Sequence, residues 1–402
     1  MKRFFSTIGT FLMGLTLMGQ PFASGGIVYE PLPDGSLQVV LGQSFYRGEV
    51  EVPPVVDGRP VSAIGRAAMN GSHGLTSLAL PETVTTIADY AFNGCDSLSS
   101  LVWHEGITSI GHHAFARCEA LRGALTLPQK LTAIGDYAFF GCHNVTTVTL
   151  PVGVSHIGSR AFMDCIQLKS IVVEQGNQAY KDVEGVLLSA DGATLLAFPR
   201  KNASWREYEV PATVTTLGEY SFYGCGNTKA VTLPDGLTAI GEWAMAACTG
   251  LKSITLPASV ASLGVNAWLD CRNLKDVTCL RAEPLKVDKY HSPFGYLADL
   301  SAKTLHVPHG TAAAYGAAEV WCEFGTIIDD ATSGLIAVGA APAAEVEISG
   351  RTVTITGNRR PAALYDLMGR KVATIATSRI QVAAPGIYVL VVDGVSHKLI
   401  IN

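Results

Sequence analysis

The sequence predicts an α/β-type solenoid, in which stacked coils share a parallel β-sheet and short helical turns, followed by a small all-β domain. The first observation is a phrase, VTTIADYAFNGC at 84–95, that returns with few changes at a nearly fixed spacing. The second is a β-prone segment, closed by proline, that follows most copies. The third is a change of composition after residue 328. A constant period of roughly 20–50 residues is typical of repeat arrays, because each unit buries its apolar side only against its neighbours.

The composition bounds the class of protein and its partners. The 402-residue chain is 48% hydrophobic and has a formal net charge of -5. That hydrophobic fraction excludes an intrinsically disordered protein. Lys and Arg are dispersed along the chain, whereas nucleic acid and anionic membranes favour a concentrated basic surface. We therefore expect no nucleic-acid partner and no membrane-surface partner.

Residues 1–25 have the three parts of a signal peptide: a Lys-Arg pair, an apolar stretch, and the small-residue segment FASGG. We expect cleavage between Ala23 and Gly26. The alternative, a membrane anchor, is disfavoured because the apolar stretch is shorter than the roughly 20 residues of a spanning helix. We expect no transmembrane segment in the mature chain. The first cysteine is Cys95, so none follows the cleavage zone to carry a lipid. The sequence therefore predicts an exported, soluble chain.

Two segments outside the regular units contain hairpin signals, in each case an Asp-Gly pair between apolar runs. The first is IVYEPLPDGSLQVVL, which together with the strand VEVPP is expected to form an N-terminal cap over 26–60. The second is GVLLSADGATLLAF, part of an insert at about 174–210 that lengthens one repeat interval to 60 residues. EYEVP at 207–211 then supplies one more solenoid strand.

The repeats occupy 61–283, with a spacing of 23 residues apart from one interval of 24 and the long interval. Their first residues are Val61, Val84, Ile107, Leu131, Val154, Val214, Leu237 and Val260. Segments such as SLAL at 77–80 alternate inward and outward, and the following proline ends each strand. Stacking turns these segments into a parallel sheet. The Ile-Gly step is expected to let the chain turn before a short helical turn such as AFNGC.

Each helical turn is expected to point one aromatic ring inward. These rings would form a spine of Phe92, Phe115, Phe139, Phe162 and Phe222. The alanine before most of them lets the turn pack closely against the next coil. The spine explains why the phrase recurs: no coil can bury its apolar side alone.

Seven cysteines share one slot of the repeat: Cys95, Cys118, Cys142, Cys165, Cys225, Cys248 and Cys271. In an exported protein, cysteines invite a disulfide interpretation. A residue that recurs once per coil and faces the core behaves instead as a small buried hydrophobe, with parallel side chains poorly aimed for bonding. The short Cys-x2-Cys spacing of zinc sites is absent, and we expect no metal. Cys279 and Cys322 remain a candidate disulfide pair.

The units VTTIADYAFNGC and LKSITLP resemble the leucine-rich repeats of the BspA-like class. The resemblance extends from about Val50 to Ile328. The insert resembles an irregular, hairpin-bearing repeat of that class, and LHVPHGTAAAYGAAEVWCEFGTI resembles its closing segment, which implies a C-terminal cap at 284–328. The resemblance implies a bacterial surface or secreted recognition protein, similar to relatives that act as adhesins for host matrix proteins.

After residue 328 the small-residue segment DDATSGLIAVGAAPAAE predicts a linker at 329–344. Residues 345–402 alternate like strands separated by Gly-centred turns and predict a small β-sandwich. LYDLMGRKV and PGIYVLVV followed by KLIIN resemble the C-terminal sorting domain of the type IX secretion pathway. That resemblance implies export machinery as a partner and an outer-membrane surface or secreted location.

Enzymatic chemistry is not indicated. The chain has no Gly-rich phosphate loop, no Gly-x-Ser-x-Gly and no His-Glu-x-x-His, and the Asp-Gly pairs are explained as turns. His112-His113 takes the slot of Asp89-Tyr90 in the preceding coil, so we interpret it as a solvent-facing turn and not as a metal pair. We expect no catalytic residues, no metal and no cofactor.

A solenoid sheet offers an extended binding surface. Its outward positions are mostly Ser, Thr, Ala and Val, and lack the Trp, Tyr and Arg anchors of tight interfaces. One slot, after the repeat leucine, is instead basic and supplies the candidate binding residues Arg122, Lys169, Lys229, Lys252 and Lys275. These side chains either bind an acidic ligand or protect the sheet edge from aggregation.

The function expected from the sequence is that of an exported, non-enzymatic surface or secreted binding protein, with a host extracellular protein or glycan as partner. Two alternatives remain open. One is a structural or assembly component of the cell envelope, and the other is a carbohydrate-binding accessory protein.

Overall fold

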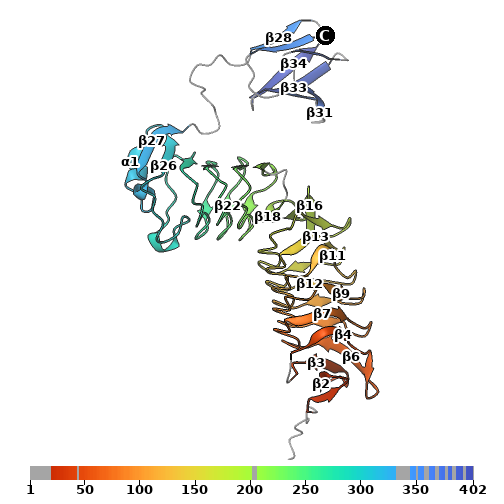
Figure 1. The fold of residues 1–402 in the computed structure, drawn as a ribbon. Coiled ribbons are helices and arrows are strands. Elements are labelled where there is room, and N and C mark those ends of the chain that lie inside the picture. The colour runs from red at the N-terminus through yellow and green to blue at the C-terminus, as the bar shows by residue number, and fades with distance from the viewer. Residues whose placement is uncertain are drawn as a thin grey trace, which may run out of the picture. The chain divides into compact units, whose positions relative to one another are not determined.

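The structure is a computed structural model that describes residues 20–42, 45–201 and 206–331, and beyond these the strands between 345 and 401. The chain divides into two compact units, 1–334 and 335–402. The first is a solenoid with few helices, so the predicted fold class is confirmed (Figure 1). Most of the expected signal peptide lies outside the described residues.

The main sheet of the solenoid is built from the predicted in-and-out segments. Each coil adds one strand, and the strands pair in parallel in four consecutive groups, β4-β7-β9, β11-β13-β15, β19-β21 and β23-β25-β26-β27. The strands are β4 (Arg47–Glu51), β7 (Gly74–Ala79), β9 (Ser100–Val102), β11 (Arg122–Thr126), β13 (Asn144–Leu150), β15 (Ser170–Val173), β19 (Glu207–Glu209), β21 (Ala230–Thr232), β23 (Ser253–Leu256), β25 (Asp276–Cys279), β26 (Thr304–Pro308) and β27 (Thr326–Ala331).

A second parallel ladder, which the sequence analysis did not predict, runs along the two-residue step that ends in Ile or Leu before the glycine or alanine of each repeat. It consists of β6 (Arg59–Ile64), β8 (Thr86–Ile87), β10 (Ser109–Ile110), β12 (Ala133–Ile134) and β14 (His156–Ile157), and after the insert of β18 (Thr194–Ala197), β20 (Thr216–Leu217), β22 (Ala239–Ile240) and β24 (Ser262–Leu263). The coils are therefore hydrogen-bonded to one another along two sides.

The glycine after this step has a different role from the one expected. Gly135 and Gly158 do not have positive φ, so no left-handed turn requires them. A Cβ at Gly135 would meet the carbonyl carbon of Gly111 at 2.6 Å, and one at Gly158 would meet the amide nitrogen of Asp136 at 2.3 Å. The chain does turn directly after these glycines, as expected, but the turn does not itself require glycine. The glycines let the backbones of successive coils approach closely.

The inward side chains form the expected spine. Phe92 stacks on Phe115 at 5.0 Å between ring centroids, and the stack continues through Phe139 to Phe162. It resumes at Phe198, whose ring lies 4.5 Å from that of Phe222. The cysteine slot is buried beside the spine, and all nine cysteines are free, including Cys279 and Cys322. The candidate disulfide between those two is not formed.

The two ends of the solenoid are closed by irregular elements. At the N-terminal end β1 (Phe22–Ser24), β2 (Ile27–Pro31) and β3 (Leu37–Val40) form an antiparallel meander, and β5 (Val55–Val56) pairs with β6. Cleavage between residues 23 and 26 would separate β1 from β2. At the C-terminal end η1 (Lys289–His291), α1 (Ala312–Gly316) and η2 (Trp321–Glu323) surround β26 and β27. The buried rings of Tyr315, Trp321 and Phe324 close the core there.

The long repeat interval contains an antiparallel hairpin. β16 (Tyr180–Val183) pairs with β17 (Val186–Ser189), and β17 pairs with β18. β18 then joins β20 in parallel, which returns the chain to the repeat ladder. The coil that contains β18 has Ala197-Phe198-Pro199 where a regular coil has a full helical turn.

The second unit contains two antiparallel sheets. One consists of β28 (Glu345–Ser349), β29 (Thr352–Thr356) and β32 (Arg379–Gln381). The other consists of β31 (Lys371–Ile375), β30 (Ala362–Asp366), β33 (Gly386–Val392) and β34 (Val395–Ile401). Their buried residues include Val353, Leu364, Val382 and Leu390.

Candidate functional site

Three of the five candidate binding residues lie on successive coils at one edge of the main sheet. Lys252 and Lys275 are neighbours, since the amide of Lys275 donates to the carbonyl of Lys252 at 2.8 Å. Lys229 lies one coil earlier, directly before β21. All three side chains are exposed. The repeat geometry thus aligns three ammonium groups along the stacking direction.

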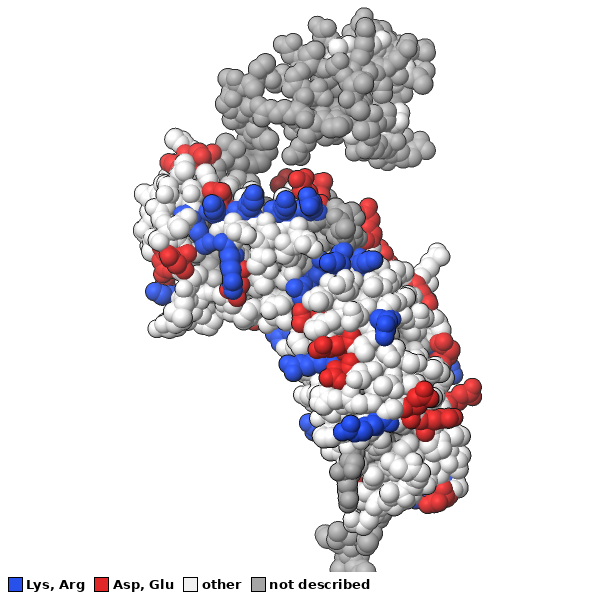
Figure 2. Space-filling view, in the orientation of Figure 1, with Lys and Arg blue, Asp and Glu red and all other residues white. Residues whose placement is uncertain are grey.

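The structure adds a fourth exposed cation that the sequence analysis missed. The amide of Lys229 donates to the carbonyl of Arg206 at 2.6 Å, so Arg206 is its neighbour in the preceding coil. We call Arg206, Lys229, Lys252 and Lys275 the cationic row. Figure 2 shows basic side chains following one another across the coils of this half of the solenoid. Arg206 was missed because it follows the insert, outside the regular phrase.

Lys303 lies at the corresponding position of the next coil, since Asp276 pairs with Thr304. Its ammonium group donates to the carbonyl of Leu274 at 2.5 Å, and its side chain is half-buried. The irregular spacing of the C-terminal cap hides this position from a search for the repeat. We leave Lys303 out of the cationic row because its ammonium group already donates to a backbone carbonyl.

Arg122 and Lys169 do not join this row. The coil between them has Thr146 at the corresponding position, and the amide of Lys169 donates to the carbonyl of Thr146 at 2.8 Å. Arg122 lies opposite Asn144, beside a bulge at Gly123. The structure therefore separates the five candidates into a contiguous group of three and two that lie on other coils, Arg122 and Lys169.

The electrostatics of the cationic row favour an anionic partner. Adjacent strands of a sheet are about 4.8 Å apart, which is less than the Debye length of about 8 Å at physiological ionic strength. Among the residues that the structure describes, none of the four cations forms an ion pair. The nearest acid in sequence to Lys275 is Asp276, whose carboxylate is 3.9 Å from His306. The like charges of the row are thus not compensated by a salt bridge.

A second ordered feature lies on the side of the helical turns. Here one side chain per coil stacks on the next, at positions whose φ is near +55° to +60°. The stack consists of Tyr90, His113, Tyr137, Arg160, Tyr220 and Trp243. Because each ring covers the face of its neighbour, only the edges of the rings inside the stack face the solvent. This outer stack is a scaffold whose inner rings offer no open face for a ligand.

The outer stack also explains the two adjacent histidines. His113 lies between the rings of Tyr90 and Tyr137, at 4.8 and 4.6 Å, and is half-buried. The prediction of a solvent-facing turn is therefore confirmed for His112, which is exposed, but is wrong for His113, which is half-buried. Nδ1 of His112 accepts from the amide of Asp136 at 3.0 Å. In the described part of the chain no group of three or more His, Cys, Asp or Glu residues is arranged to hold a metal ion.

Comparison with known proteins agrees with this geometry. The model of the BspA type leucine rich repeat region matches residues 61–182 and 197–287 in six copies. A leucine-rich repeat protein from Eubacterium ventriosum superposes with a TM-score of 0.55 at 21% identity, over 77% of this chain and 85% of that one. The pneumococcal vaccine antigen PcpA superposes with a TM-score of 0.51 at 19% identity, over 78% of this chain and 100% of that one. No curated protein matches the sequence.

Proposed function

The chain belongs to the BspA-type leucine-rich repeat family, and we propose on that premise that its solenoid is a non-enzymatic binding module, exported to the cell surface or secreted. The proposed ligand is an acidic macromolecule, either an acidic patch of a host extracellular protein or a sulfated or uronic-acid glycan. The proposed site is the cationic row.

The observation that carries this proposal is the alignment of four exposed cations without an ion-pair partner among the described residues. Cations held this close raise one another's electrostatic energy, and an anionic ligand that spans several coils lowers it. Such a ligand gains mainly in association rate, and the gain falls with added salt. Arg122 and Lys169 are proposed as secondary contacts for a ligand long enough to reach them.

The rest of the main sheet favours an extended, shallow contact over a deep pocket. Its outward residues are small, and its exposed apolar residues are single valines such as Val102 and Val172. A flat Ser/Thr face of this kind also suits the alternative function, an envelope component that assembles through its sheet. The cationic row favours the binding module, because like charges on every copy would oppose self-assembly along that edge.

Export is part of the proposal and rests on three features. The first 25 residues have the composition of a signal peptide. None of the helices in the described chain has the length and apolar character needed to cross a membrane. One structural neighbour is a vaccine antigen. We propose that the second unit, residues 335–402, directs the chain to the outer surface as a sorting or attachment domain.

A direct experiment separates the binding module from the assembly component. The full chain would be titrated over immobilised heparin, a sulfated glycan, and over polyglutamate, and its self-association would be followed by sedimentation velocity. The binding module predicts saturable capture by at least one polyanion and a chain that stays monomeric at micromolar concentration. Concentration-dependent association with no capture by either polyanion would favour the envelope component instead.

A further inference from the structure

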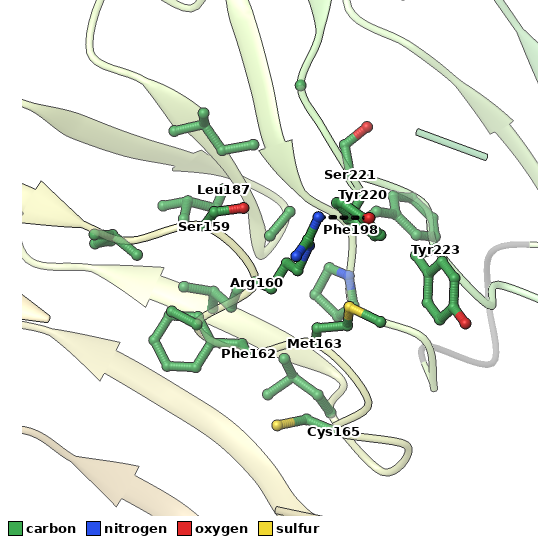
Figure 3. Close-up of a pocket in the computed structure, with 18 of the residues that line it drawn as sticks. Ser159, Arg160, Phe162, Met163, Cys165, Leu187, Phe198, Tyr220, Ser221 and Tyr223 are labelled. Atoms are coloured by element: carbon green, nitrogen blue, oxygen red, sulfur yellow. Dashed lines mark hydrogen bonds between the residues drawn. The ribbon is translucent and has the colours of Figure 1, made fainter. Parts of the chain in front are cut away.

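The backbone contacts between the helical turns of successive coils are interrupted between Phe162 and Phe198, and a cavity of about 250 Å³ lies there. It lies between the helical turn at 160–165 and the segments 196–200 and 218–223 (Figure 3). The Phe spine is stacked on both sides, from Phe139 to Phe162 and from Phe198 to Phe222. The coil of β18 supplies a shortened turn with Pro199, so it does not fill the space that a regular turn fills.

The cavity contains backbone donors without acceptors. In the preceding coil the amides of Tyr137 and Phe139 donate to carbonyls of the next coil at 3.0 and 2.9 Å. The amides at the equivalent positions, Arg160, Phe162 and Asp164, have no acceptor among the described residues. All three residues line the cavity. An unpaired buried amide is costly, so this edge of the turn favours an acceptor group.

Two side chains add further unpaired donors. Ser221 is 2% exposed, and its hydroxyl has no hydrogen-bond partner among the residues that the structure describes. The corresponding residue is alanine in the other coils with this turn, for example Ala138 and Ala244, so the hydroxyl is specific to the coil beside the cavity. Nε of Arg160 is buried and also has no hydrogen-bond partner in the described part of the chain. One of the remaining nitrogens of that guanidinium donates to the hydroxyl of Tyr220 (Figure 3). The other donates to the hydroxyl of Tyr137, and the two bonds fix the orientation of the guanidinium.

The walls of the cavity are mostly apolar. They include Phe162, Met163, Leu187, Leu196 and Phe198. Its volume is slightly below the roughly 300–1,000 Å³ of typical small-molecule sites. A ligand that fits would therefore combine a short apolar body with an acceptor group.

The charges at the cavity favour a singly charged acceptor group. Asp164 lines the cavity but is paired with Arg200 at 2.6 Å, whereas Arg160 forms no ion pair with a carboxylate of the described residues. Glu219 also lines the cavity and is exposed to solvent, so a doubly charged group would face its repulsion. An ionised carboxylate carries one charge and only accepts hydrogen bonds, which matches the surplus of donors.

From these observations we infer that the cavity is a binding site for a small carboxylate with an apolar tail. The carboxylate accepts hydrogen bonds from Arg160 Nε, from the Ser221 hydroxyl and from the free amides of the 160–165 turn. The tail lies against Phe162, Leu187 and Phe198. This site is independent of the cationic row, and neither site requires the other.

The test uses sodium octanoate as the probe and isothermal titration calorimetry of the full chain. The site predicts saturable binding of one octanoate per chain, and much weaker binding of 1-octanol, which has the same tail without the charge. Ser221→Ala should weaken octanoate binding about tenfold to a hundredfold, the usual effect of removing one hydrogen bond to a charged group. This variant should fold, because alanine is the regular residue of that slot. The control Ser155→Ala, which removes an exposed hydroxyl, should bind octanoate as the unmodified chain does.

A second variant tests the tail. Ala197→Phe adds a ring to a residue that lines the cavity and should abolish octanoate binding while the melting temperature stays close to that of the unmodified chain. Ordered water satisfies buried donors as well, and a cavity that holds only water would overturn the inference. That outcome would appear as no saturable octanoate binding, as equal binding of octanoate and octanol, or as octanoate binding unchanged by Ser221→Ala.

Discussion

The rings of Phe115 and Phe139 lie parallel on successive coils, with 2° between their planes and 5.4 Å between their centroids. Phe139 is 1% exposed, and its other face lies against Phe162. Truncating it would leave a cavity in the middle of the spine. We expect Phe139→Ala to lower the free energy of unfolding by about 3 to 5 kcal/mol, measured by urea denaturation. Thr149→Ala, on the outward face of β13, is the control, and an equal loss in both variants would refute the spine.

The cysteine slot has a hydrogen-bonding role that explains its recurrence. Cys142 Sγ donates to the carbonyl of Phe115 at 3.2 Å, and Cys118 makes the same contact with Phe92. Burial raises the pKa of Cys95, Cys165 and Cys225 to about 12, which disfavours the reactive thiolate. We therefore expect the seven thiols of the slot to be reduced in the folded protein. All except Cys271 should be unreactive toward a thiol reagent, because a hydrogen bond with Cys248 lowers the pKa of Cys271.

Denaturation without reductant should then expose all seven, together with Cys279 and Cys322, in a thiol titration. A count below seven, once oxidation between chains has been excluded, would show that the slot forms disulfides.

The outer stack predicts a pH dependence of stability. Burial, with the nearby His112 as a smaller cause, lowers the pKa of His113 from its ordinary value. The unfolded chain therefore binds a proton at His113 more readily than the folded chain does, so stability rises with pH up to about 6.5 and falls as the pH is lowered below it.

His113→Tyr restores the commonest residue of the slot and should remove this contribution. Urea midpoints at pH 5 and pH 7.5 should then differ less in the variant than in the unmodified chain. His156→Ala, which removes an exposed histidine, should keep the original difference. If the difference between the two urea midpoints is as large in His113→Tyr as in the unmodified chain, His113 is not the group that causes the pH dependence.

The second unit should be dispensable for the solenoid but required for delivery. The boundary at 334 separates the two units, so deleting residues 341 to 402 should leave the melting temperature of the solenoid unchanged in calorimetry. If the second unit is read by export machinery, the truncated protein should accumulate in the periplasm of its native host. Cell fractionation would measure how much of each protein reaches the surface. Equal surface delivery of the truncated and full chains would contradict the sorting role.

The repeated contacts were predictable from the sequence because each depends on a residue type that recurs at one spacing. Phe139 and Cys142 occupy slots that only an inward apolar side chain explains. The close approach at Gly158 was not predictable in the same way, because a glycine after a strand is equally typical of a turn. Its neighbour is a backbone atom of another coil, and no residue pattern reports that distance.

The features that depart from the repeat were less predictable. Arg206 belongs to the cationic row through a backbone contact with Lys229, yet it lies outside the phrase that defines the slot. The cavity arises where a turn is shortened, and the sequence shows the insert but not the space it leaves. The sequence did contain one signal for the cavity, because Ser221 places a hydroxyl in a slot that alanine otherwise fills.

The most direct test of the central claim is reversal of charge in the cationic row. Lys229, Lys252 and Lys275 would be changed together to Glu, and capture of the full chain by immobilised heparin and by polyglutamate would be measured by surface plasmon resonance from low to physiological salt. The control is reversal of Arg117, Lys130 and Arg272, which removes the same charge from exposed positions outside the row. The account predicts that the unmodified chain and the control are captured with an association rate that falls as salt rises, and that the row variant loses most of that rate. Capture that is insensitive to salt and unchanged by reversal of the row would contradict it.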